Sequence, residues 1–288
     1  MSAWPQIIED CDSLDEILSR PSQRLVDALA ALEGDILILG VGGKMGPSPN
    51  IIYMAGRKFG STGAEAQTWA INAYLPGVIA RTCPRSRIVV FSSGNVYPLS
   101  PLAHGGSIEE DPPGPIGEYA QAVLARERVF EHFSRSQGTP MVLLRLNYAI
   151  DLRYGVLFDI GSRVYAGQPI DLTMGHVNVI WQGDANTYAL LALALCSSPP
   201  AILNVTGPET IPVRWLAQRF AQHFGKPALT QGTEAGMALL NNAARCFGRF
   251  GYPTVPLDVM VRWVAHWIEA GGPGLGKPTH FETRDGRF

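Results

Sequence analysis

The sequence predicts an α/β protein whose mostly parallel sheet is covered by helices on both faces. Two observations carry this prediction: short apolar runs recur along the chain, and segments with helical periodicity lie between them. The runs expected to form buried strands are residues 35–39, 51–55, 87–91, 141–146 and 202–205. Neighbouring parallel strands need crossover connections, and the helical segments between the runs provide them.

Helices are expected between these runs and at the N-terminus. Two short helices are predicted within residues 13–33. The other helical patterns cover residues 64–82, 118–137, 156–167, 184–196, 212–224, 236–248 and 256–270. A chain of 288 residues is long enough for one large α/β unit with a smaller appendage.

Composition excludes several classes of function. Charged residues make up 17% of the chain, the formal net charge is −2, and no run of like charges occurs, so nucleic acid and anionic membranes are not expected as partners. The 4 cysteines form no C-x-x-C pair and the 6 histidines show no metal-ligand spacing, which argues against a disulfide framework and a metal site. The N-terminus is acidic, and the apolar stretches are too short to span a bilayer, so a cytoplasmic protein is expected.

The first expected strand leads into a glycine-rich turn. Gly40, Gly43 and Gly46 follow residues 35–39 at intervals of three. Glycines let the backbone approach a pyrophosphate closely, and the N–H groups of a following helix point at it. The turn predicts a dinucleotide phosphate site, although an ordinary glycine turn explains these residues equally well when they are considered alone.

Further phrases follow this turn in a specific order. They are Ala55, Gly56 and Lys58 after the second strand, Asn72 in the next helix, Ser92 to Tyr97 at the end of the third strand, and Tyr119 at the start of the following helix. This order resembles the extended short-chain dehydrogenase/reductase family, the NAD-dependent epimerase/dehydratases. The likeness runs from about residue 35 to 270, and it implies a Rossmann-type doubly wound sheet.

The resemblance also implies a cofactor and roles for individual residues. NAD or NADP would be held by Gly40, Gly43, Gly46, Ala55, Gly56, Lys58 and Asn72. Ser93 would hold the reacting oxygen of a small-molecule substrate, and Tyr119 would exchange its proton while nicotinamide exchanges hydride. Asn147, Arg153 and His176 are candidate substrate contacts from loops.

The sequence departs from the family at one catalytic position. The family has a lysine four residues after the tyrosine, where it shares a helix face with the phenol and lowers a pKa that is ordinarily about 10. Here this position is Val123. Arg126, Lys58 and Arg153 are the candidates for a replacement cation.

A second departure lies between Gly46 and Ile51. Only four residues, two of them proline, stand where the family has a helix, a strand, a second helix and a further strand. Either this segment is absent from the sequence or the chain has lost half of its nucleotide fold. The acidic residue that distinguishes NAD from NADP would end the missing second strand, so the cofactor preference cannot be predicted.

Four regions are expected from these observations: an N-terminal helical extension at 1–34, an NAD(P)-binding domain at 35–150, a smaller α/β substrate part at 151–272, and a flexible tail at 273–288. The predicted function is that of an NAD(P)-dependent epimerase, dehydratase or reductase acting on a sugar nucleotide or a related polyhydroxy compound. The alternative is a non-catalytic NAD(P)-binding sensor or partner protein that kept the fold and lost the lysine. The family also implies a homodimer through the helices at 64–82 and 118–137.

Overall fold

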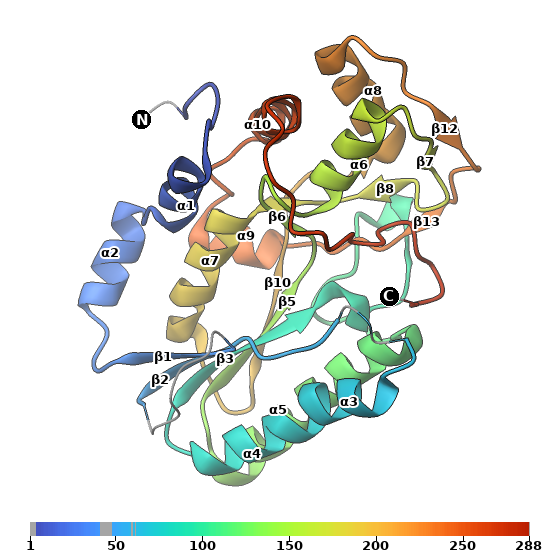
Figure 1. The fold of residues 1–288 in the computed structure, drawn as a ribbon. Helices are drawn as coiled ribbons and strands as arrows, with labels where there is room; N and C mark the ends of the chain where they lie inside the picture. The colour runs from blue at the N-terminus through green and yellow to red at the C-terminus, as the bar shows by residue number, and fades with distance from the viewer. Residues whose placement is uncertain (1–3, 41–47, 59, 61, 288) are drawn as a thin grey trace.

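The computed structural model describes residues 4–40, 48–58, 60 and 62–287, and its centre is a five-stranded sheet (Figure 1). The strand order is β1-β2-β3-β5-β10, and every neighbouring pair is parallel. The strands are β1 (Ile36–Leu39), β2 (Asn50–Tyr53), β3 (Arg87–Ser93), β5 (Met141–Leu146) and β10 (Ala201–Val205). All five predicted strands are confirmed within one to two residues at each end.

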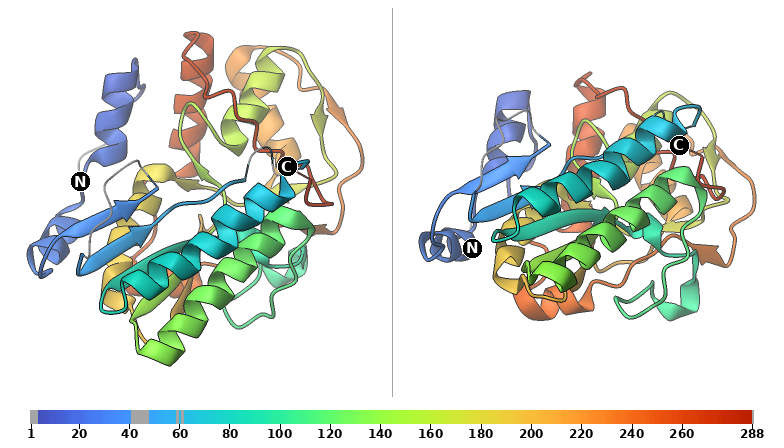
Figure 2. Two further views of the ribbon diagram at one scale, coloured as in Figure 1. Left: turned by 60° about the horizontal axis from the view of Figure 1, so that its bottom comes forward. Right: turned by 90° about the horizontal axis from the view of Figure 1, so that it is seen from below.

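Helices cover both faces of this sheet, because alternate residues of each strand point to opposite sides. Ile51 and Tyr53 of β2 pack with Phe130 on one face, whereas Ile52 belongs to a separate cluster on the other. The first face is covered by α3 (Glu65–Trp69), a π-helical turn (Ala70–Tyr74), α4 (Leu75–Thr82) and α5 (Gly117–Gln137), which lie in front of the sheet in Figure 2. The second face is covered by α7 (Gln182–Leu191), a 3₁₀ turn (Ala192–Leu195) and α9 (Ala244–Phe250). The predicted doubly wound α/β class is therefore confirmed.

A smaller part of the chain packs beside the carboxyl ends of the strands. Three helices form its centre: α6 (Val156–Tyr165), α8 (Val213–Phe224) and α10 (Leu257–Glu269). The N-terminal helices α1 (Cys11–Ser19) and α2 (Gln23–Ala30) lie against α7. Four two-stranded pairings connect the loops: β13 (Met237–Ala238) with β4 (Ser100–Pro101), β6 (Ala149–Ile150) with β9 (Ile180–Trp181), β12 (Thr230–Gln231) with β7 (Ile170–Asp171), and β11 (Ile211–Pro212) with β8 (His176–Val177).

Two sequence-based expectations are wrong. The helix expected at 236–248 starts only at Ala244, because Leu239 and Leu240 are buried in a loop cluster and the side chain of Asn242 accepts a hydrogen bond from the Ala244 N–H at 2.9 Å. The C-terminal segment expected to be a flexible tail is packed against the rest of the protein: Phe281 is only 1% exposed and belongs to the core of the smaller part.

The first strand has a neighbour on one side only within the described sheet. Ile36 of β1 pairs with Asn50 of β2, so the chain between Leu39 and Asn50 joins two adjacent parallel strands directly. A cavity of about 370 Å³ lies between these strands and α7, and Ile38, Ile52 and Leu190 contribute to its apolar lining. The described sheet therefore ends at β1, where the family pattern would continue with further strands. The predicted positions Gly43 and Gly46 lie outside the described residues.

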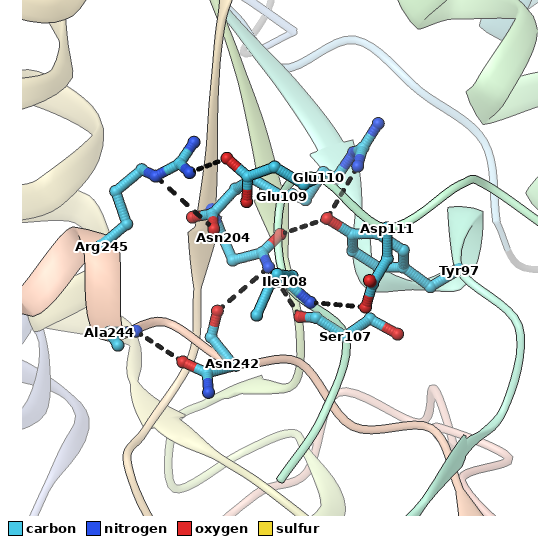
Figure 3. Close-up of polar contacts among 11 residues, drawn as sticks. Tyr97, Ser107, Ile108, Glu109, Glu110, Asp111, Asn204, Asn242, Ala244 and Arg245 are labelled. Carbon is cyan, nitrogen blue, oxygen red and sulfur yellow. Dashed lines mark hydrogen bonds and ion pairs between the residues drawn. The ribbon is translucent and has the colours of Figure 1, made fainter. Parts of the chain in front are cut away.

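Asn204 holds the loop that follows β3 against β10 (Figure 3). Its side-chain oxygen accepts a hydrogen bond from the Tyr97 hydroxyl at 2.9 Å, and its amide nitrogen donates to the carbonyls of Ser107 and Asn242 at 2.9 and 3.0 Å. The Asn204 backbone N–H donates to Glu109 at 2.9 Å. These contacts fix the segment that leads into α5, and so they fix the position of Tyr119 at the start of that helix.

Candidate functional site

A cavity of about 200 Å³ lies at the carboxyl ends of β3 and β5. It brings together four residues that the sequence predicted for the site: Lys58, Ser93, Tyr119 and Asn147. The carboxyl edge of a parallel sheet is where ligands bind in doubly wound folds, because loops from several strands meet there. The candidate site therefore lies where the fold class predicts it.

Ser93 and Tyr119 form the polar centre of this cavity. Ser93 is the last residue of β3, and its hydroxyl donates to the side chain of Asn95 at 2.9 Å while accepting from the Asn95 N–H at 3.2 Å. Tyr119 lies in the first turn of α5 and is hydrogen-bonded to Ser93. Burial raises the pKa of the Tyr119 phenol, whereas the positive charge of Arg126 and the hydrogen bond with Ser93 lower it. Burial is the largest of these effects, and the pKa stays above its ordinary value.

Lys58 faces the ring of this tyrosine. Its Nζ lies 5.9 Å from the ring centroid of Tyr119 and donates to the carbonyl of Thr279 at 3.5 Å. Burial lowers the pKa of Lys58 to about 8, and the negative charge of Asp159 opposes this effect only in part. The ammonium group is therefore charged at neutral pH and loses its proton in mildly alkaline solution.

Val123 brings no positive charge to the phenol. Its side chain is fully buried in an apolar cluster with Val96 and Tyr97, and Tyr119 packs against this cluster. An aliphatic residue therefore fills the space on this side of the helix.

Gly56 and Asn72, which the resemblance assigns to the cofactor site, lie next to the guanidinium group of Arg126. The side-chain oxygen of Asn72 accepts hydrogen bonds from Arg126 Nη2 at 2.6 Å and from the Arg57 N–H at 2.9 Å. A Cβ atom on Gly56 would lie 2.6 Å from Arg126 Nη2, so any larger residue would require this guanidinium to shift.

The other predicted site residues that the structure describes lie apart from the cavity. Gly40 has φ of +124°, and a Cβ atom there would collide with the backbone at Ala55, so this pair is explained by the contact between β1 and β2. Arg153 forms ion pairs with Asp15 at 3.0 Å and Asp151 at 3.3 Å. His176 lies in β8 and pairs with Pro212. Neither Arg153 nor His176 lines the cavity.

Tyr148, Tyr154 and Thr279 line the site but were not among the predicted site residues. Tyr148 has φ of +43°, which is unusual for a residue other than glycine and recurs at functional sites. Tyr154 adds a further phenol, and burial raises its pKa. Thr279 comes from the C-terminal segment, where its N–H and hydroxyl donate to Asp159 at 2.7 and 2.5 Å. Only the tyrosines could have been suspected, because they closely follow the predicted Asn147.

Two absences hold for the part of the chain that the structure describes. No group of three or more histidine, cysteine, aspartate or glutamate side chains is placed to hold a metal ion. In the same residues, no helix combines the length and the apolar character that crossing a membrane requires.

Comparison with known proteins confirms the resemblance inferred from the sequence. Residues 48–150 match the model of the NAD dependent epimerase/dehydratase family. A search of curated proteins gave no match.

Three solved structures illustrate the similarity of the fold. UDP-glucose 4-epimerase of Thermus thermophilus, solved with NAD, has a TM-score of 0.66 and 18% identity over 77% of this chain and 78% of that chain. RMD from Pseudomonas aeruginosa, complexed with NADPH, has a TM-score of 0.68 and 17% identity, and the match covers 87% of this chain and 96% of that chain. UDP-glucuronic acid 4-epimerase from Bacillus cereus, with UDP-glucuronic acid and NAD, has a TM-score of 0.64 and 16% identity, and the match covers 77% of this chain and 75% of that chain. The shared feature is the fold of the epimerase/dehydratase class.

Proposed function

We propose that this chain binds NAD or NADP and catalyses epimerisation, dehydration or reduction of a sugar nucleotide or a related polyhydroxy compound. The observation that carries the proposal is the convergence of Ser93, Tyr119 and Lys58 on one cavity at the carboxyl edge of the sheet. The family match over residues 48–150 supports the class of chemistry, and the UDP-sugar epimerases among the similar structures support the class of substrate.

In this proposal, the reactive end of the cavity would take a nicotinamide group and a substrate hydroxyl or carbonyl. A bound nicotinamide would supply the hydride acceptor or donor. Ser93 donates a hydrogen bond to the substrate oxygen and so orients the carbon that bears it. Tyr119 takes the proton from that oxygen in the oxidising direction and returns it in the reducing direction. Asn147 lies at the same edge and is held by a 2.9 Å hydrogen bond from its amide to Asn178.

The first test is binding and turnover with the intact protein. Isothermal calorimetry with NAD, NADH, NADP and NADPH is expected to give binding of at least one of them below millimolar concentration. With that cofactor, UDP-glucose and UDP-glucuronic acid are then tested for an epimerised or dehydrated product and for a change in nicotinamide absorbance. No heat with any of the four cofactors at millimolar concentration would contradict the proposal.

The sensor alternative is favoured by the buried Val123, which brings no ammonium group to the phenol. It predicts cofactor binding without turnover of any sugar nucleotide. It also predicts that Tyr119→Phe leaves the affinity for cofactor unchanged. Turnover that depends on Tyr119 would exclude it.

The cofactor affinity is expected to depend on pH through Lys58. The charged ammonium attracts the cofactor's phosphates, and its pKa of about 8 means that this attraction weakens as pH rises through 8. The affinity should then fall by up to about tenfold per pH unit, as expected when binding requires one proton on the protein. Calorimetry at pH values on both sides of 8 measures this slope.

The matched variants are Lys58→Met and Lys226→Met. The Lys58→Met variant should bind the cofactor weakly at every pH, and its affinity should no longer fall as the pH rises. Lys226 is exposed and lies outside the residues lining the cavity, so Lys226→Met should keep the wild-type slope. A wild-type affinity that does not change across pH 8 would remove Lys58 from the cofactor site.

A further inference from the structure

The C-terminal segment passes directly over the candidate site. In Figure 1 it leaves α10 and runs between the smaller part above and the helices α3 and α5 below. Thr279 of this segment lines the cavity and is only 1% exposed. Seven residues later, Gly286 lies against Gly117, which begins α5 two residues before Tyr119. Residues 279–287, the C-terminal strap, therefore extend from the cavity to the start of α5.

Polar contacts hold the strap on the smaller part. The N–H and the hydroxyl of Thr279 donate to the Asp159 carboxylate at 2.7 and 2.5 Å, and hydrogen bonds to a charged acceptor are stronger than neutral ones. Glu282 forms an ion pair with Arg163 at 3.0 Å, one turn further along α6. Phe281, between these two contacts, is inserted in the core of the smaller part. The strap is thus held at separate points and contains no helix or strand.

The far end of the strap is in backbone contact with α5. Gly286 and Gly117 both have positive φ, +72° and +82°. A Cβ atom on Gly286 would collide with the carbonyl of Ile116, and one on Gly117 would collide with the carbonyl of Gly286. Between the two ends of the strap, Arg284 donates to the Met237 carbonyl at 2.8 Å. The strap therefore packs on the first turn of α5, which carries the proposed acid and base.

The cavity beside the strap is small for the proposed ligands. Its volume is about 200 Å³, whereas small-molecule sites usually measure about 300–1,000 Å³. Under the proposed function a nicotinamide group and a sugar share this space, and Thr279 forms part of its wall. The Nζ of Lys58, the proposed contact of the cofactor phosphates, also lies 3.5 Å from the Thr279 carbonyl. The strap and the cofactor therefore compete for the same space and for the same ammonium group.

We propose that the C-terminal strap is an autoinhibitory gate, which closes the candidate cavity until it lifts from Asp159 and from the start of α5; for the identity of the ligands, this inference rests on the proposed function. A ligand that binds only the open state has an apparent affinity reduced by the fraction of molecules in which the strap is open. Substitutions that release the strap should therefore strengthen binding. A segment that only stabilised the fold would give weaker binding when it is released.

The first experiment measures access to the cavity without cofactor or substrate. Ala149 lines the cavity, so Ala149→Cys places a thiol there whose reaction with N-ethylmaleimide is followed by peptide mass spectrometry. In this background, Asp159→Ala removes the acceptor of both Thr279 hydrogen bonds. It should raise the labelling rate about tenfold or more, because one hydrogen bond to a charged group stabilises the closed state by about this factor.

Gly286→Ala releases the strap from its other end. The added methyl group would collide with the carbonyl of Ile116, so the strap has to move off α5 and the labelling rate should rise again. The two variants act at opposite ends of the strap, and either one tests the proposal if the other does not fold. Labelling as slow as in the Ala149→Cys parent, in a folded variant of either kind, would overturn the proposal.

Asp258→Ala is the matched control for Asp159→Ala. Both aspartates lie in the first turn of a helix of the smaller part, but Asp258 is 69% exposed and pairs with Arg219 of α8 instead of the strap. Asp258→Ala should leave the labelling rate unchanged. Equal gains in the two variants would mean that general loosening of the smaller part opens the cavity, and the gate would be the wrong assignment.

The second experiment separates the gate from the proposed function. Calorimetry with NAD, NADH, NADP and NADPH compares wild type with Gly286→Ala, which leaves every charge around the cavity in place. Gly286→Ala should bind the cofactor more tightly, by the same factor by which the labelling rate rises, because both quantities follow the open fraction. If labelling becomes faster but neither protein binds a cofactor, the proposed function fails and the gate stands. If both proteins bind cofactor with equal affinity, the gate fails alone.

Discussion

The Tyr119→Phe variant is expected to lose about 10²–10⁴-fold in kcat, the typical contribution of a positioned acid or base. Its folding free energy should change by less than about 1.5 kcal/mol, because the lost hydroxyl and its hydrogen bond with Ser93 lie at the edge of a cavity. Turnover of the UDP-sugar that the wild type accepts measures the first quantity. Urea unfolding measures the second.

Tyr154→Phe is the matched control for this prediction. It removes a phenol hydroxyl from the same cavity, yet Tyr154 lies in the loop before α6 and has no part in the proposed proton transfer. We expect it to change kcat by less than tenfold. Equal losses in the two variants would mean that the cavity tolerates no polar deletion, and the specific assignment of Tyr119 would fail.

Arg145→Met is expected to destabilise the protein by about 3–5 kcal/mol, the usual cost of leaving one partner of a buried ion pair alone. Arg145 and Glu127 join β5 to α5 through two hydrogen bonds of 2.9 and 2.7 Å, and their side chains are only 3% and 2% exposed. Ser92 also donates to Glu127 at 2.5 Å, and Arg145 donates to the Tyr97 hydroxyl at 2.7 Å. The free energy of unfolding in urea measures the loss.

Two variants check the cause of this loss. Arg135→Met breaks the ion pair of Arg135 with Glu131. Because the Arg135 side chain is 60% exposed, this variant should lower the free energy of unfolding by less than about 1 kcal/mol. The double variant Arg145→Met/Glu127→Leu should recover much of the stability, because no uncompensated charge remains. If Arg145→Met costs no more than Arg135→Met, the buried pair does not stabilise the junction of β5 and α5.

Much of the fold was predictable because buried parallel strands form short continuous apolar runs. The apolar run 141–146 forms β5 with the predicted bounds. The helix expected at 118–137 begins at Gly117, one residue before the predicted start. The error at 236–248 has a local reason. Leu239 and Leu240 are apolar because they fill a loop cluster with Met174, and an apolar loop can imitate one turn of a helix.

The candidate site was predictable only where it depends on strand ends. Ser93 ends β3, and Tyr119 follows on the next helix, so the topology alone brings them together. Thr279 could not be predicted, because it reaches the cavity through tertiary packing of a segment that lacks regular structure. The contacts of Arg126 with Gly56 and Asn72 were also not predicted from the sequence, because Gly56 and Asn72 had been assigned to a cofactor pattern.

The end of the described sheet at β1 has a consequence for how long a bound dinucleotide stays on the protein. Under the proposed function, the reactive end of a dinucleotide would meet Ser93 and Tyr119, and within the described sheet no strand beyond β1 would contact its adenosine end. Differences in affinity among related complexes arise mostly from dissociation rates, so fewer contacts mean a shorter residence time. An enzyme that returns hydride to the same substrate keeps its cofactor between turnovers, whereas net reduction requires release and reloading in every cycle.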